Sequence, residues 1–77
     1  MSAKLKKKLN LVLQSFFKRR QVFFSIENTK NWDSLNHFKL ITVLQKKFQI
    51  SIENNQISEL TDEKKILEFL KKHEAKN

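Results

Sequence analysis

Hydrophobic and polar positions alternate with helical spacing in several stretches of this 77-residue chain. In the first stretch, residues 4–19, an apolar side chain recurs every three or four positions. These side chains are Leu5, Leu9, Val12, Leu13 and Phe16. This spacing predicts an amphipathic helix, with lysines on its other faces. The apolar face is expected to pack in the core, and its alternative use is to lie on an anionic membrane surface.

A second helix is predicted over residues 34–47, with Asp33 or Ser34 as its N-cap. Its apolar side chains are expected to point inward, or partly so. They are Leu35, Phe38, Ile41, Leu44 and Phe48. Between the two helices, residues 20–33 are predicted to form a long loop in which Phe24 and Ile26 fill the core.

Two further helices are predicted, a short one at residues 56–60 and a last one at residues 62–73. The last helix has Thr61 as its expected N-cap, acids in its first turn and bases, including His73, in its last turn. That order of charges suits the helix dipole. Residues 22–26 and 49–52 have strand-like compositions, but a lone strand has nothing to pair with. The sequence therefore predicts an all-α fold in a single domain, residues 1–77.

The composition excludes several kinds of site. Cysteine, glycine and proline are all absent. Without cysteine there is no disulfide framework and no Cys-based zinc site. Without glycine there is no glycine-rich loop to cradle a phosphate. Neither histidine has a partner at metal-ligand spacing, so no metal site is predicted.

The net charge of +8 is concentrated at the start of the chain, where residues 1–26 carry seven basic side chains and no acid. One interpretation is a nucleic-acid-binding domain that uses residues 4–20. However, 14 of the 16 basic residues are lysine, which suggests attraction to the nucleic-acid backbone rather than base recognition. No stretch approaches the ~20 apolar residues of a spanning helix. We expect a cytoplasmic protein with no stable membrane insertion.

The one candidate site is Ser34, where a polar loop gives way to the second helix. A nucleophilic serine would need a base and an oxyanion hole. His37 is three residues away, which is not a triad geometry, and His37 is expected to be an exposed helix residue that could also contact a phosphate. Trp32 is expected to pack at the junction between loop and helix. We predict no catalytic residue, and interpret Ser34 as a residue that another enzyme modifies.

The run that begins at Trp32 resembles an acyl carrier protein. It reads WDSLNHFKLITVLQKKFQISIENNQISELTDEKKILEFL. It matches the family pattern without a gap up to Leu70, about half of the chain, including the Asp-Ser-Leu triplet at residues 33–35. Residues 4–31 fit only loosely, as a first helix and a long loop of suitable length.

The resemblance implies a monomeric four-helix bundle with a long first loop and a short third helix. It also implies that a magnesium-dependent phosphopantetheinyl transferase recognises Asp33 and esterifies Ser34 with 4′-phosphopantetheine from coenzyme A. The thiol of that group would carry an acyl, aminoacyl or polyketide cargo as a thioester. Further partners would be acyl-loading and acyl-transfer or synthase enzymes of lipid, fatty-acid or secondary metabolism.

One departure from the family is large, because carrier proteins are typically acidic along the second helix. This chain has no acid between Asp33 and Glu53. The residues expected to contact partner enzymes are Leu35, Phe38, Lys39, Thr42, Lys46 and Lys47. One interpretation is a specialised carrier with a dedicated partner that has an acidic docking surface. The other is a lysine-rich proteome in which docking relies on the uncharged members of the set.

Overall fold

The computed structural model describes residues 2–75 of the protein and the side chains of residues 4–73. Four helices account for most of them: α1 (Ser2–Phe17), α2 (Ser34–Phe48), α3 (Asn54–Ile57) and α4 (Glu63–Ala75). Over these residues the only β-type pairing is an isolated antiparallel bridge between Ser25 and Asp62. The predicted all-α fold with a long first loop and a short third helix is confirmed.

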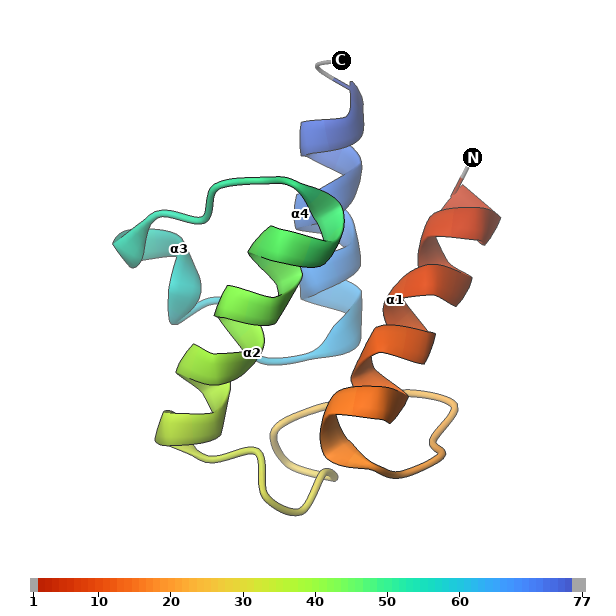
Figure 1. The fold of residues 1–77 in the computed structure, drawn as a ribbon, viewed down its shortest axis with the longest axis vertical. Coiled ribbons are helices and arrows are strands. Elements are labelled where there is room, and N and C mark those ends of the chain that lie inside the picture. The colour runs from red at the N-terminus through yellow and green to blue at the C-terminus, as the bar shows by residue number, and fades with distance from the viewer. Residues whose placement is uncertain (1, 76–77) are drawn as a thin grey trace.

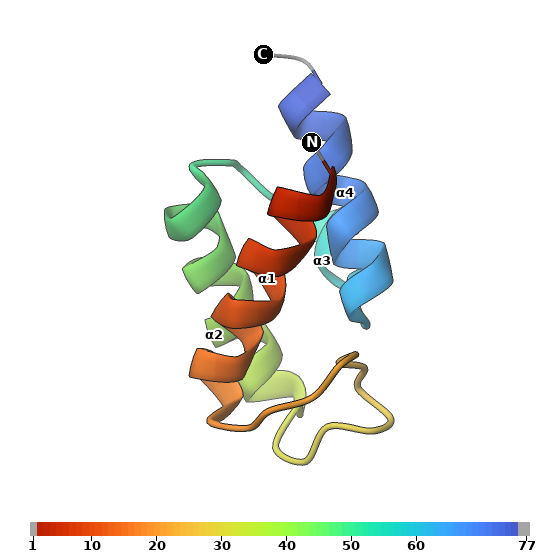
Figure 2. The same ribbon diagram turned by 90° about the vertical axis from the view of Figure 1, so that its right-hand side faces the viewer.

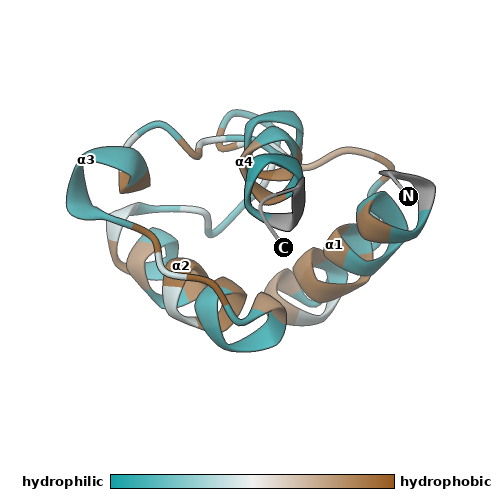
Figure 3. Ribbon diagram, turned by 90° about the horizontal axis from the view of Figure 1, so that it is seen from above, coloured by the Kyte–Doolittle hydropathy of each residue, from teal (hydrophilic) through white to brown (hydrophobic). Residues whose placement is uncertain are grey.

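The three long helices are arranged so that α1 runs antiparallel to both α2 and α4 (Figures 1 and 2). Seen from above, they form a triangle, and α3 lies to one side beside α2 and α4 (Figure 3). The loop of residues 18–33 closes one end of the molecule and leads directly to the start of α2 (Figure 1). This end therefore sets the position of Ser34.

The hydrophobic core lies between the long helices and includes one side chain from the first loop. Its largest fully buried side chains are Phe24, Leu9, Leu13, Leu40, Leu44 and Ile66. At the loop end, the ring of Phe17 lies 5.9 Å from that of Phe24 and 5.1 Å from that of Trp32, measured between centroids. These aromatic contacts support the loop beneath the first turn of α2.

Three residues expected to point inward are exposed instead: Ile26, Leu35 and Phe38. Leu35 lies in the first turn of α2 and is 66% exposed, outside the buried face of that helix. Ile26 is exposed because a turn starts at Ser25, whose N–H donates to Asn28 Oδ1 at 2.8 Å and leads the chain away from the core. Phe38 is 59% exposed, because His37, Leu40, Ile41 and Leu44 form the buried face of α2.

The first helix spans Ser2–Phe17 rather than residues 4–19, and the chain leaves it at Lys18, which has a positive φ of 56°. The last two helices also differ from the prediction. The third helix lies at Asn54–Ile57 rather than 56–60, because Gln56 Oε1 accepts a hydrogen bond from Glu53 N at 3.1 Å and caps an earlier turn. Asp62, not Thr61, caps α4, since Asp62 Oδ1 accepts from Lys65 N at 2.7 Å.

Candidate functional site

Ser34 is the first residue of α2, and Asp33 is the N-cap. The Asp33 backbone is extended, and its Oδ1 accepts a hydrogen bond from Asn36 N at 2.9 Å. Such a cap stabilises a helix start by about 1 kcal/mol. Of the two N-caps that the sequence allowed, the structure uses Asp33, which leaves Ser34 free of that role.

The loop that delivers Ser34 is held by its own hydrogen bonds. Asn31 has a positive φ of 75°, and its carbonyl oxygen accepts from Asn36 Nδ2 at 2.7 Å. Trp32 is buried at the junction, as the sequence predicted. The chain on both sides of Ser34 is therefore fixed, which is the local rigidity that presentation of a hydroxyl group requires.

Ser34 and Leu35 themselves are exposed, Leu35 by 66%. Among the described residues, the hydroxyl group of Ser34 and the backbone N–H groups of Ser34 and Leu35 have no hydrogen-bond partner. N–H groups at a helix start lack intrahelical acceptors and carry the positive end of the dipole. An exposed hydroxyl group beside free N–H donors is thus suited to hold a phosphate ester.

His37 is buried, so its predicted exposure and its contact with a phosphate are both wrong. Only 8% of its surface is exposed. Its Nδ1 accepts from Trp32 Nε1 at 2.9 Å, which leaves Nε2 to donate to the carbonyl oxygen of Ile57 at 2.7 Å. With both ring nitrogens engaged, His37 does not serve as a base for Ser34. A histidine on the same helix face as Leu40 and Leu44 was the sequence signal for this burial.

Replacing His37 by alanine is expected to lower the free energy of unfolding by about 2 kcal/mol, because it leaves the buried indole N–H of Trp32 unpaired. Urea unfolding would measure the change. His73→Ala is the matched control, since among the described residues the hydrogen bond of His73 is to the Phe69 carbonyl oxygen one turn earlier in its own helix. Equal losses in both variants would contradict a stabilising connection between Trp32, His37 and Ile57.

The six residues predicted to contact partner enzymes are all exposed on α2. They are Leu35, Phe38, Lys39, Thr42, Lys46 and Lys47. Most recur at the three- or four-residue spacing of one helix face. Beside the start of this helix, Lys18 and Lys39 line one small depression together with Asn31 and Asn36. This depression next to the start of α2 therefore has two positive charges and, among the described residues, no acid in its lining.

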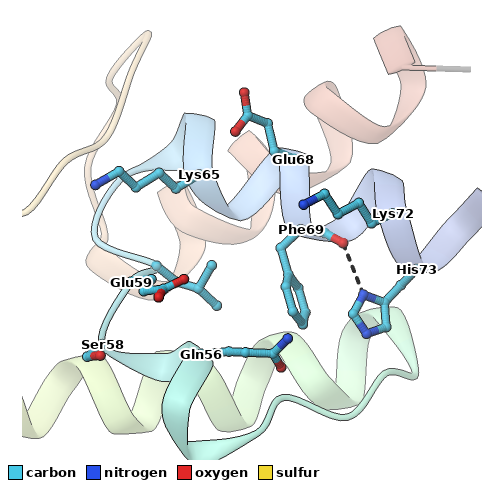
Figure 4. A pocket seen from close by; sticks show the side chains of 9 residues that line it. Gln56, Ser58, Glu59, Lys65, Glu68, Phe69, Lys72 and His73 are labelled. Carbon is cyan, nitrogen blue, oxygen red and sulfur yellow. Dashed lines mark hydrogen bonds between the residues drawn. The ribbon is translucent and has the colours of Figure 1, made fainter.

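A larger groove, of about 920 Å³, opens between α3 and α4. The ring of Phe69 points into it from α4, and Gln56 and Glu59 lie opposite (Figure 4). His73, in the last turn of α4 as expected, lies with its ring centroid 4.1 Å from that of Phe69. Ser34 is not among the residues that line this groove. Sequence periodicity did not reveal this groove, because the groove exists only where α3 packs beside α4.

The described residues hold neither a metal cluster nor a spanning helix. Over this part of the chain, no three His, Cys, Asp or Glu side chains gather where they could hold a metal ion. None of the helices in residues 2–75 has the length and apolar character needed to cross a membrane.

No family model, no curated protein and no solved structure matches this chain. The functional interpretation therefore depends on the residues of the site and on their geometry.

Proposed function

We propose that this protein is an acyl carrier protein of the cytoplasm, with Ser34 as the attachment point of 4′-phosphopantetheine. The observation that carries the proposal is the exposed hydroxyl group of Ser34 at the first position of α2, between the capping Asp33 and the exposed Leu35. A nucleophilic role lacks a base, because both ring nitrogens of His37 are hydrogen-bonded elsewhere. Modification by another enzyme uses the same exposure without requiring a base in this chain.

The residues around Ser34 fit a phosphodiester. The free N–H groups of the first turn of α2 can donate to its oxygens, and the helix dipole favours its negative charge. Asp33 is the residue that the transferase would recognise, and its cap bond to Asn36 keeps the serine at the helix start. When bound, the group supplies the thiol on which cargo is carried as a thioester.

The exposed face of α2 supports docking next to the attachment point. Leu35 and Phe38 are 66% and 59% exposed, and apolar side chains of this size are favourable contacts once a partner covers them. The cations around them are Lys39, Lys46 and Lys47, with no acid on this helix. Partner enzymes with acidic docking surfaces fit this face, and the proposed setting is a specialised biosynthetic pathway.

The test is to incubate the protein with coenzyme A, magnesium and a broad-specificity phosphopantetheinyl transferase, and to measure the intact mass. We expect a gain of one phosphopantetheine group. Ser34→Ala should gain nothing, whereas Ser51→Ala, a change at another exposed serine outside the helices, should be modified like the wild type. No mass gain in the wild type, or a gain that persists in Ser34→Ala, would refute the proposal.

A further inference from the structure

A second surface, separate from α2, lies on the outer side of α1 and at the start of the first loop. Two depressions meet there, and Leu11 and Gln14 line both. We call this region the α1 surface. Its exposed members are Lys6, Lys7, Leu11, Ser15, Lys18, Arg19, Arg20 and Val22. In Figure 2, α1 lies in front and α2 behind it.

The α1 surface includes two exposed apolar side chains, Leu11 and Val22. Leu11 is 53% exposed, and Val22, at the start of the loop, is 93% exposed. Leu11 and Val22 do not belong to the apolar helix face that the spacing of residues 4–19 predicts. Leu9 and Leu13 of that face are fully buried in the core. Single exposed apolar residues are common on protein surfaces. The two here share one depression with Lys6 and Lys7.

The charge that the α1 surface presents is positive throughout. Its cations are Lys6, Lys7, Lys18, Arg19 and Arg20. Among the described residues, the one carboxylate that lines either depression belongs to Glu63, which is 2% exposed. That carboxylate accepts hydrogen bonds from Asn10 Nδ2 at 3.1 Å and from Phe24 N at 3.0 Å, so it is directed into the protein.

We propose that the α1 surface binds the face of an anionic phospholipid bilayer. Lysines and arginines around exposed apolar side chains match that interface, where the cations meet lipid phosphates and the apolar groups enter between the headgroups. A nucleic acid would contact the same cations, but its phosphates offer nothing to Leu11 and Val22. Since α2 is a separate helix, its exposed face can remain accessible while α1 is bound.

The experiment uses the whole unmodified chain and vesicles of phosphatidylcholine, with and without phosphatidylglycerol, in a sedimentation assay. We expect binding to the anionic vesicles alone, weakening as salt is added. Replacing Leu11 and Val22 together by serine removes apolar contacts without changing the charge, and should weaken binding roughly tenfold. Replacing Arg19 and Arg20 by glutamine should weaken it roughly thirtyfold.

The matched control replaces Leu35 and Phe38 by serine, which removes comparable exposed apolar area from α2 and should leave vesicle binding unchanged. Equal binding to neutral vesicles, or full binding by the Leu11 and Val22 variant, would overturn the proposal. So would tighter binding to duplex DNA than to the vesicles, which would assign the surface to nucleic acid. Because the unmodified chain is used, the result is independent of any modification at Ser34.

Discussion

Replacing Phe24 by alanine is expected to lower the free energy of unfolding by about 3–5 kcal/mol. Phe24 is fully buried although it lies in a loop, and its ring stacks on that of Phe17. Its backbone is paired on both sides with Glu63. Phe24 N donates to the Glu63 carboxylate at 3.0 Å, and the Phe24 carbonyl oxygen accepts from Glu63 N at 2.7 Å. This rigid attachment limits collapse around the cavity, which keeps the cost high.

The Phe24→Ala change would remove a large share of the free energy of unfolding, because a domain of this length has a total of about 4–12 kcal/mol. Urea unfolding followed by circular dichroism measures it. Phe23→Ala is the matched control: the residue type is the same and the position adjacent, but Phe23 is exposed. Its expected loss is below about 1 kcal/mol. Similar losses in the two variants would contradict the role of Phe24 in joining the loop to α4.

The sequence predicted the three long helices because their apolar residues follow one period over several turns, whereas the single turn of α3 was predicted at 56–60 rather than at Asn54–Ile57. It also predicted the burial of Phe24 and of Trp32. Periodicity could not show that His37 rather than Phe38 is buried on α2. The pattern counts histidine as polar, whereas in the fold both ring nitrogens of His37 have hydrogen-bond partners. Those partners, Trp32 and Ile57, come from the loop and from α3. Trp32 and Ile57 come close to His37 only when the loop, α2 and α3 pack together, so the local sequence pattern does not contain this information.

The burial of Glu63 was likewise not predictable from the sequence pattern. An acid in the first turn of a helix is expected on the surface, facing the dipole. Here it is buried, since Asn10 from α1 and the backbone of Phe24 supply its donors. The position of Ser34 at the start of α2 could be predicted more easily, because a helix start and its cap depend on residues that are close together in the sequence. The groove between α3 and α4 could not be predicted, because it depends on contacts between distant elements.

Reversing the charge of Lys39, Lys46 and Lys47 to glutamate is expected to raise the rate at which a transferase with a basic docking surface modifies Ser34, by about tenfold at low salt. These lysines are exposed on α2, the helix that begins at Ser34. In the wild type they would repel such an enzyme, and in the variant they would attract it. The measurement is kcat/KM for coenzyme A-dependent modification, at about 0.01 M and at about 1 M salt.

The salt dependence separates docking from other causes, because screening at about 1 M salt shortens the Debye length to about 3 Å and should abolish the difference between the proteins. The matched control reverses Lys64, Lys65 and Lys71, three exposed lysines on α4, and so makes the same change in net charge away from α2. We expect at most a small gain from it. An equal gain in both variants would assign the effect to net charge alone, and no gain in the α2 variant would show that this helix does not set the choice of partner.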